Sequence, residues 1–598
     1  MKIIYKDGSV AEAEVSQELE VLRHSAAHIM AQAVKRLYPH ADFGYGPATE
    51  KGFYYDIDLG DTKLSDEDLA AIEAEMKKIT KENLPIRPYV MSREEAIAHM
   101  QELGEKYKVE HIGDLPEDAE ISFFQQGDYV DMCTGPHLCY TKALKAFKIT
   151  GQSGAYWKND KNNKMLTRIY GTAFKTQEEL DAYLKMVEEA ERRDHNKLGR
   201  ELGFFTTVDA IGQGLPILLP KGSRVIQLLQ RWVEDIEQEH GYLLTKTPLM
   251  AKRDLYRISG HWDHYRDGMF ILGDADDEEK ECLAMRPMTC PFQYQVYLNS
   301  ARSYRELPMR LGETSTLFRN EDSGEMHGLI RVRQFTISEG HLVLRPDQLE
   351  AEFADCLSLS KYFLETVGLL EDCTFRFSQW DPNNTAKYEG TAEQWNDAQD
   401  TMAKILENLG VNYEIGIDEA AFYGPKLDIQ YKNVFGKEDT IVTIQIDMLL
   451  AEKFGMYYTD ADGQKKLPYI IHRTSLGCYE RTLAYLIEKY AGALPTWISP
   501  EQVRILTITD RANDYAEEIR LALAKKYRVS VDDSQNTLKY KIRNAQLEKV
   551  PYMIILGDKD IENKTVSVRH RSGEDLGAIS IDEFQSILAD VVDNKLKK

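Results

Sequence analysis

The strongest constraint on the fold of this chain is a charged segment at residues 176–201, which has the pattern of one long helix. Its apolar residues recur every three to four positions among many charged side chains, the spacing of an amphipathic helix. The chain has 598 residues, several times the usual size of one domain, so three or four domains are expected. We therefore predict that residues 176–201 form a linker helix between two of them.

The region before this helix has the pattern of a small mixed domain. Residues 1–20 predict a hairpin around a Lys-Asp-Gly-Ser turn, a remnant too short to fold alone. Residues 21–175 combine short strands with amphipathic helices, which we expect over residues 67–82 and 92–107. We predict an α+β domain over 21–175.

The region after the linker helix predicts two more domains. A central domain, residues 202–498, ends where Pro495 and Pro500 bracket a linker. Residues 499–598 then alternate strands and helices, which favours an α/β domain with a mostly parallel, helix-covered sheet. The expected fold is thus a multidomain α+β protein.

Composition excludes several classes of protein. The chain is 43% hydrophobic and 29% charged, and it has no apolar run near the roughly 20 residues that span a bilayer. Seven scattered cysteines do not make a disulfide framework. We expect a cytoplasmic protein with no membrane partner. A formal charge of −24 argues against indiscriminate nucleic-acid binding but permits a local basic face.

Three stretches of the central domain carry its chemistry. The first is a long amphipathic helix followed by Gly241 and a short strand that ends at Pro248. The second predicts two antiparallel strands joined by a polar loop, and we place four residues on these strands: Arg319, Glu321, Arg331 and Phe335. In the third, Gly477 leads into a helix that carries Arg481.

In this order the three stretches resemble motifs 1, 2 and 3 of class II aminoacyl-tRNA synthetases. Together with GHWDHY, MRPMTCPF, FYGPKLD and LGDKDIENKTVSVRHR, they resemble the threonyl-tRNA synthetase family over nearly the whole chain from about Leu22. The resemblance implies an editing domain at 21–175, a class II antiparallel-sheet catalytic domain at 202–498 and an anticodon-binding domain at 499–598.

The resemblance implies an ATP site rich in arginine. Guanidinium groups stay charged and bind phosphate bidentately, which suits a reaction between a carboxylate and a phosphate. By resemblance Arg319 holds the α-phosphate, Arg331 and Arg481 hold the others, Glu321 reads the adenine amino group and Phe335 stacks on the ring. Two further residues are expected to line the pocket, Lys426 and Gln445. The alternative for any single arginine is a surface ion pair, worth about 0 to 1 kcal/mol.

The same resemblance implies one zinc ion per chain, held by Cys290, His341 and His472. Their spacing alone does not show that they meet. One Cys and two His leave an open coordination position, at which threonine would be separated from valine by up to about 10⁴ to 10⁵. Serine lacks only a methyl group, worth about 1 to 3 kcal/mol, so it would need a second, hydrolytic site. The expected amino-acid pocket consists of Met288, Ile337, Glu339 and Tyr423.

Two pairs of residues suit that second site. His24 and His28 share one helix face at i and i+4, and Cys133 and His137 have the same spacing on another segment. By spacing these four would also make a tetrahedral zinc set, and a vestigial site is a further alternative. The resemblance implies an editing site that works without metal, with two more residues beside it, Lys108 and Asp131. We consider a covalent Cys133 nucleophile less favoured, because positioned water is sufficient to hydrolyse an activated ester.

The resemblance extends to substrates and partners. ATP with Mg²⁺, L-threonine and tRNA(Thr) are expected, as is a homodimer formed through the motif 1 helix. His261 matches a position that assists transfer to the tRNA, although a structural histidine is the alternative. Four positions match anticodon readers, for which a solvated face is the alternative: Asn536, Arg543, Asp560 and Arg569.

The chain departs from the family in three places. The small N-terminal domain is reduced to residues 1–20. Residues 337–341 read Ile-Ser-Glu-Gly-His where many members have Gln-Asp-Asp-Ala-His, and Phe292 and Gln293 replace Gly-His. We favour a rebuilt pocket wall over altered substrate or inhibitor sensitivity, because the zinc ligands and motif arginines are retained. Two rival functions are a ligase for serine or a non-standard amino acid, and a non-catalytic RNA-binding descendant that would have lost these residues.

Overall fold

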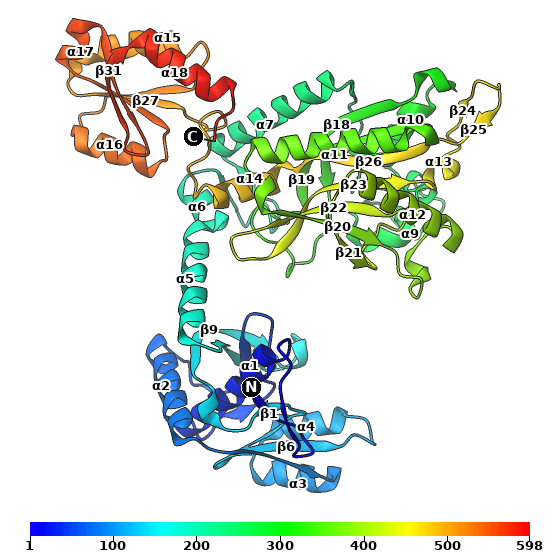
Figure 1. Ribbon diagram of the computed structural model, residues 1–598, viewed down its shortest axis with the longest axis vertical. Coiled ribbons are helices and arrows are strands. Elements are labelled where there is room, and N and C mark those ends of the chain that lie inside the picture. Colours follow the sequence, from blue (N-terminus) through cyan, green and yellow to red (C-terminus); the bar gives the residue numbers. More distant parts are fainter. Residues whose placement is uncertain (598) are drawn as a thin grey trace. The chain divides into compact units, whose positions relative to one another are not determined.

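The computed structural model describes residues 1–597 and divides into two compact units, residues 1–188 and the chain from residue 189 onward. Figure 1 shows each unit as a mixture of helices and sheets. Among residues 1–597, no helix combines the length and apolar character needed to cross a bilayer.

The first unit packs the helices α1 to α4 against three small sheets, as an α+β domain does. Its sheets have the strand orders β2-β1-β8, β3-β4-β10-β9 and β5-β6-β7. The helices are α1 (Glu18–Leu37), α2 (Asp66–Glu82), α3 (Arg93–Glu102) and α4 (Lys106–Asp114). The strands are β1 (Lys2–Ile4), β2 (Val10–Glu12), β3 (Asp42–Phe43), β4 (Phe53–Asp58), β5 (Ile86–Met91), β6 (Ile121–Gln126), β7 (Tyr129–Met132), β8 (His137–Leu138), β9 (Ala146–Tyr156) and β10 (Met165–Phe174).

Two expected helices are each broken in the structure. The helix expected over 92–107 splits into α3 and α4 because Gly104 adopts a left-handed conformation, with φ of +77°. The linker helix expected over 176–201 splits into α5 (Gln177–Arg193) and α6 (His195–Glu201). Asp194 leaves the helical region between them, and its side chain accepts a hydrogen bond from the amide of Asn196, so a new helix begins there.

The second unit is built on an eight-stranded sheet that is antiparallel except at its two edges. The strands, in spatial order, are β13 (Leu243–Leu244), β18 (Met309–Phe318), β19 (Gln334–Leu344), β26 (Tyr469–Cys478), β23 (Glu438–Asp447), β22 (Lys426–Lys432), β20 (Cys373–Gln379) and β21 (Glu414–Ile417). Apolar faces of three helices form the core with this sheet: α7 (Pro220–Glu239), α11 (Leu349–Thr366) and α14 (Tyr479–Lys489).

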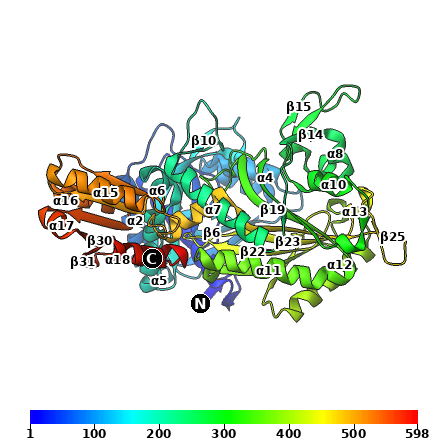
Figure 2. The same ribbon diagram turned by 90° about the horizontal axis from the view of Figure 1, so that it is seen from above.

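Smaller helices and strands lie beside this sheet. Figure 2 shows a three-stranded sheet lying near α8 and α10, and apolar residues of these elements share one core. The elements are α8 (Arg253–Ile258), α9 (His261–Tyr265), α10 (Cys290–Leu298), α12 (Ala392–Asn408), α13 (Leu450–Lys453), β14 (Met250–Lys252), β15 (Ile271–Leu272) and β16 (Leu283–Met285). Two small sheets complete this part of the unit. One pairs β11 (Phe205–Thr206) with β12 (Ile217–Leu218), and the other has three strands, with β24 (Tyr458–Thr459) between β17 (Arg302–Ser303) and β25 (Lys465–Lys466).

The C-terminal part is the expected α/β domain, although its sheet is only partly parallel. The strands, in spatial order, are β28 (Val529–Asp532), β27 (Val503–Thr507), β29 (Tyr552–Leu556), β30 (Thr565–His570) and β31 (Asp575–Ser580), and the last two run antiparallel. Helices α15 (Asn513–Leu523) and α18 (Ile581–Asp593) cover one face and α16 (Leu538–Leu547) the other (Figure 1). Two elements of this domain were not expected from the sequence, β31 and α17 (Asp558–Asn563).

Candidate active and editing sites

The register of the central sheet brings the expected zinc ligands together. His341 on β19 lies directly opposite His472 on β26, and Cys290 begins α10 next to them. One ligand atom from each residue lies within 4.8 Å of the others, and all three side chains are buried. Residues far apart in sequence therefore form a cluster of zinc-ligand type.

The surroundings of this cluster test whether it fits a metal. Nδ1 of His341 lies 2.6 Å from Oε1 of Gln293, while its Nε2 is buried with no hydrogen-bond partner among the described residues. His472 has one nitrogen, Nε2, 2.9 Å from Asp447. A ligand histidine typically has one nitrogen held by an oxygen and the other available. These residues fit a zinc ion.

This geometry also accounts for one departure from the family pattern. Gln293, where many members have His, is fully buried. Its Oε1 accepts from His341, and its Nε2 donates to the hydroxyl of Thr245 at 2.8 Å. Gln293 thus orients a ligand of the cluster. No pattern in the sequence predicts this contact, because it depends on how α10 packs against β19.

The expected ATP and amino-acid residues line one cavity of about 500 Å³ that also reaches His472. The expected residues on its wall are His261, Met288, Arg319, Glu321, Arg331, Phe335, Ile337, Glu339, Tyr423, Lys426, Gln445 and Arg481. One expectation was wrong in detail: Arg319, Glu321 and Arg331 lie on the loop between β18 and β19 rather than on the strands. Their loop positions still place both guanidinium groups on the cavity wall.

The arginines of the cavity are held by defined partners. Arg481 donates to the carbonyls of Ile330 at 2.9 Å and Thr440 at 2.6 Å. The Arg319 guanidinium carbon lies 5.2 Å from the centre of the Phe335 ring. Because carbonyls and an aromatic ring do not neutralise a cation, Arg481 and Arg319 keep charge available for an anion.

Two other cations of the cavity, Arg331 and Lys426, are each paired with a carboxylate. Nε of Arg331 lies 2.9 Å from Oε2 of Glu321, and Lys426 lies 2.7 Å from Asp428.

Gly477, which precedes α14, has φ of +75°, and a Cβ there would lie 2.0 Å from the carbonyl of Ile441. Only glycine therefore fits at the turn that leads to Arg481.

Two residues that depart from the family pattern, Ile337 and Glu339, lie on the cavity wall. Ile337 packs against buried Leu317, Val332 and Phe335, so it contributes an apolar surface. Glu339 accepts a hydrogen bond of 2.5 Å from the hydroxyl of Thr289, and burial raises the pKa of its carboxyl group. The longer side chain of glutamate is thus accommodated by a specific partner.

His261 is a buried residue of α9 on the cavity wall. Its Nδ1 lies 2.8 Å from the hydroxyl of Ser259. Burial, with smaller contributions from His472 and Arg319, lowers the pKa of His261 to about 3. The imidazole is therefore neutral near pH 7 before any anionic substrate enters.

In the first unit, the second histidine–cysteine set also comes together. Ligand atoms of His24, His28, Cys133 and His137 lie within 4.8 Å of one another. Nε2 of His137 is 3.0 Å from Sγ of Cys133, and its Nδ1 is 3.2 Å from the hydroxyl of Ser25. Burial lowers the pKa of each of the three histidines and raises that of the Cys133 thiol. Without a metal, the cluster consists of neutral imidazoles and a thiol rather than a thiolate.

The two other expected editing residues, Lys108 and Asp131, form a buried ion pair beside this cluster. Nζ of Lys108 lies 2.7 Å from Oδ1 of Asp131, and Oδ2 lies 3.6 Å from Nε2 of His28. Tyr55 donates to Asp131 at 2.5 Å and accepts from Lys108 at 2.8 Å. Tyr55 was not expected at this site, because a tyrosine within a strand has no spacing relation to the motif.

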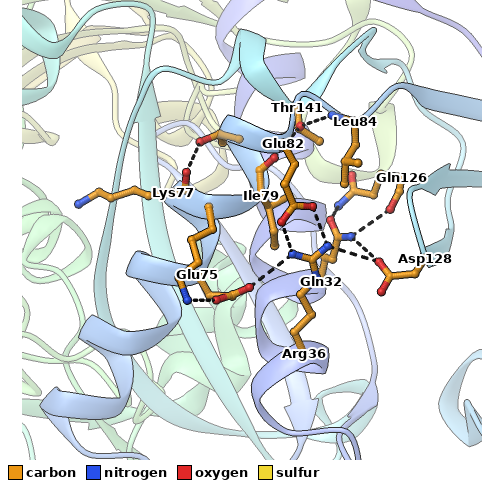
Figure 3. A network of polar contacts seen from close by, with 12 residues as sticks. Gln32, Arg36, Glu75, Lys77, Ile79, Glu82, Leu84, Gln126, Asp128 and Thr141 are labelled. Carbon is orange, nitrogen blue, oxygen red and sulfur yellow. Dashed lines mark hydrogen bonds and ion pairs between the residues drawn. The ribbon is translucent and has the colours of Figure 1, made fainter.

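A polar network fixes the helix that carries His24 and His28 (Figure 3). Gln126 donates to the carbonyl of His28 at 3.1 Å and to the side chain of Gln32 at 3.0 Å. One turn later, Arg36 forms two hydrogen bonds with Glu82 of α2, at 2.7 and 3.0 Å. These contacts hold α1 in one register, so its two histidines face the Cys133 segment.

Comparison with known proteins gives matches over nearly the whole chain. Three family models match: the class II tRNA synthetase core domain (G, H, P, S and T) at residues 272–490, the anticodon-binding domain at 502–590, and the second additional domain of threonyl and alanyl tRNA synthetases at 121–170. A threonine–tRNA ligase of Clostridium perfringens is 56% identical over 97% of this chain and 90% of its own length. One from Geobacillus kaustophilus is 44% identical over 99% of this chain and 91% of its own length. This chain belongs to the threonine–tRNA ligase family.

Solved structures agree with this assignment. The RNA-binding domain of threonyl-tRNA synthetase from Cryptosporidium parvum is 30% identical, with a TM-score of 0.62, over 67% of this chain and 98% of that one. A prolyl-tRNA synthetase from the same organism, 17% identical with a TM-score of 0.52 over 69% of this chain and 78% of its own, shares the fold. The expected class II, editing and anticodon-binding architecture is therefore confirmed.

As a threonine–tRNA ligase, this enzyme aminoacylates tRNA with threonine, and it contains the domain type associated with editing. Its anticodon-binding domain carries the four expected reader positions. Asn536 and Arg543 are exposed, and Arg569 pairs with Asp575 at 3.1 Å. Asp560 is buried and accepts hydrogen bonds from Gly557 and two hydroxyl groups, so its carboxylate supports the local fold. The role of these four residues in anticodon recognition stays a prediction.

Proposed function

We propose that the enzyme converts ATP and L-threonine to threonyl-adenylate, transfers the threonyl group to tRNA(Thr), and hydrolyses seryl-tRNA(Thr) at the histidine–cysteine cluster of its first unit. The observation that carries this proposal is the single cavity whose wall includes both the motif arginines and His472 of the metal cluster. A cavity that combines phosphate-binding cations with a metal cluster suits ATP and a polar amino acid together.

In the first step a carboxylate oxygen of threonine attacks the α-phosphorus of ATP, and pyrophosphate leaves. Arg319 stabilises the negative charge that grows on the α-phosphate, while Arg331 and Arg481 bind the other phosphates with Mg²⁺. Phe335 stacks on adenine and Glu321 accepts from its amino group. ATP binding then replaces the ion pair between Arg331 and Glu321. Lys426 and Gln445 complete the wall.

Cys290, His341 and His472 would hold zinc beside the amino-acid pocket formed by Met288, Ile337, Glu339 and Tyr423. When bound, zinc would supply a Lewis acid that an amine and a hydroxyl can coordinate together and that a methyl group cannot. Gln293 and Asp447 orient the two imidazoles. Valine is thereby rejected for its missing hydroxyl.

Transfer and editing complete the cycle. The 2′-hydroxyl of the tRNA attacks the adenylate carbonyl and AMP leaves. We assign to neutral His261 the role of accepting the proton of that hydroxyl. Serine passes the first site, because one missing methyl group is worth only about 1 to 3 kcal/mol. His24, His28, Cys133 and His137 orient water against the seryl ester, with Asp131 and Lys108 beside them.

Amino-acid-dependent exchange between ATP and pyrophosphate tests the first step. We expect exchange to be strong with threonine, weaker with serine and absent with valine. Replacing Arg319 with alanine should lower the threonine-dependent rate on the order of 10²- to 10³-fold, because a charge-stabilising donor is lost. An Arg520→Ala variant is the matched control, since Arg520 is half-buried and pairs with Glu517 on α15. Preference for serine, or no exchange with any of the three, would mean that Ile337 and Glu339 mark another substrate.

We also propose a homodimer through the motif 1 region. β13 is an edge strand of the eight-stranded sheet, and exposed apolar side chains gather on and after it: Leu243 57%, Leu244 66%, Leu249 40% and Met250 41%. An apolar edge of this kind marks an interaction surface. Sedimentation should give twice the chain mass for the natural protein and a monomer for Leu244→Asp, whereas an exposed leucine elsewhere, Leu547→Asp, should leave the dimer intact.

Domain limits and location follow the same reasoning. We propose an editing domain at 21–175 preceded by the short segment 1–20, a linker at 176–201, a catalytic domain at 202–498 and an anticodon-binding domain at 499–598. The family matches fall inside three of these ranges. A cytoplasmic enzyme is proposed because ATP and tRNA are its substrates.

A further inference from the structure

A buried histidine outside the cavity holds the loop that carries Arg331. His195, the first residue of α6, is fully buried. Its Nδ1 lies 2.7 Å from Oε1 of Glu488 on α14, and its Nε2 lies 3.2 Å from the backbone nitrogen of Leu329. The imidazole therefore joins three segments: the start of α6, the motif 3 helix and the loop between β18 and β19.

The partners of His195 determine which of its ring nitrogens carries the proton. A backbone N–H can only donate, so Nε2 must present a lone pair to Leu329. Nδ1 then carries the ring proton and donates to the carboxylate of Glu488. Glu488 is itself fully buried, and its second oxygen has no hydrogen-bond partner among the described residues. A neutral ring of one tautomer thus connects a buried carboxylate to a loop amide.

The loop is shaped to receive this imidazole. His327 and Arg331 face each other as an isolated bridge, and the amide of Ile330 donates to the carbonyl of His327 at 2.9 Å. Between them Gly328 has φ of +50°, and a Cβ there would lie 2.1 Å from Nε2 of His195. No side chain fits at residue 328 while His195 occupies its place.

The same turn determines the positions of two arginine side chains of the ATP cavity. Arg331 closes the turn, and its side chain lines the cavity. The carbonyl of Ile330, next to Leu329, accepts the 2.9 Å hydrogen bond that orients Arg481. A shift of the Leu329 amide would therefore move one phosphate-binding arginine and release a partner of the other.

We propose that His195 is a positioning residue for ATP: its Nε2 holds the Leu329 amide and thereby keeps Arg331 and Arg481 in place for the phosphates. This inference rests on the proposed roles of those two arginines. It gives a function to a residue at the end of the linker that touches no substrate.

Two substitutions separate the two nitrogens of His195. The amide group of glutamine reaches about as far as Nε2, so His195→Gln keeps an acceptor for Leu329 and loses Glu488. Asparagine reaches about as far as Nδ1, so His195→Asn keeps a donor to Glu488 and loses the Leu329 bond. We expect His195→Asn to raise the KM for ATP in pyrophosphate exchange on the order of tenfold, with the KM for threonine unchanged and His195→Gln close to the natural protein. His240→Asn, at an exposed histidine after α7, is the control.

Hydrogen exchange at the Leu329 amide gives a readout that needs no activity. Exchange should be slow in the natural protein and His195→Gln, and fast in His195→Asn, at equal melting temperatures. Equal KM for ATP in both variants, or a parallel rise in the KM for threonine, would overturn the positioning role. If both variants unfold, the natural protein alone still tests the positioning role, because fast hydrogen exchange at its Leu329 amide would contradict the hydrogen bond to His195. If the natural protein shows no threonine-dependent exchange between ATP and pyrophosphate, the proposed function is refuted. Hydrogen exchange at the Leu329 amide needs no activity, so it tests the role of His195 separately.

Discussion

Replacing Cys290 with serine is expected to remove zinc from the enzyme and to lower threonine-dependent pyrophosphate exchange on the order of 10³-fold. Serine keeps the size of the side chain but lacks the thiolate that binds zinc. Only two ligands, His341 and His472, would remain in the cluster. A metal that polarises a substrate contributes several kcal/mol, and about 1.4 kcal/mol corresponds to a factor of ten in rate, so a loss of this size is expected.

The measurement combines zinc content per chain with exchange rates for threonine. Cys356→Ser is the matched control, because Cys356 is also buried but lies on α11, where its thiol contacts Tyr242. We expect one zinc per chain in the natural protein and in the control. Unchanged exchange by a zinc-free Cys290→Ser variant would contradict a role for the metal in binding threonine.

A graded variant tests the surroundings of the metal rather than its ligands. Gln293→Leu leaves all three ligands in place but removes the oxygen that holds Nδ1 of His341 at 2.6 Å. Loss of such a partner typically costs about 10- to 100-fold in metal affinity, so zinc should be lost at lower chelator concentrations. The result would explain why a buried polar residue is kept at a position that departs from the family pattern.

The general fold could be predicted from the sequence because its signals are local. Hydrophobic periodicity identified α2 and α7, and the alternation of apolar and polar segments identified four of the five strands of the C-terminal domain, all but β31. The break at Gly104 carried a local sign, a glycine within the helical pattern. The break at Asp194 offered only a possible N-cap side chain, and the contact of His195 with Glu488 that accompanies it is tertiary.

The candidate site required more than spacing. Cys290, His341 and His472 meet because β19 and β26 pair in one particular register, which no local pattern specifies. The resemblance to a family supplied that information for the expected residues. It supplied nothing for Tyr55 or Gln293, whose contacts depend on the packing of one element against another.

Replacing His137 with alanine is expected to slow the deacylation of seryl-tRNA about 10²- to 10⁴-fold, the usual contribution of a positioned acid–base group. His137 lies at the centre of the cluster, between Ser25 and Cys133. Aminoacylation with threonine should be unchanged, because the catalytic residues belong to the second unit. The measurement is the decay of preformed seryl-tRNA, and His99→Ala, on α3 of the same unit, is the control. Equal decay rates for the two variants would remove His137 from the editing reaction.

Cys133→Ala then distinguishes the three readings of this cluster. A neutral thiol that only helps to orient water predicts a modest loss of deacylation, since the histidines remain. A covalent nucleophile predicts no activity in Cys133→Ala and a seryl-enzyme in the natural protein. A zinc site predicts a second metal per chain and inhibition by chelators. Because burial raises the pKa of the Cys133 thiol and the reactive form of cysteine is the thiolate, we expect the first outcome: deacylation that persists without the sulfur and without metal.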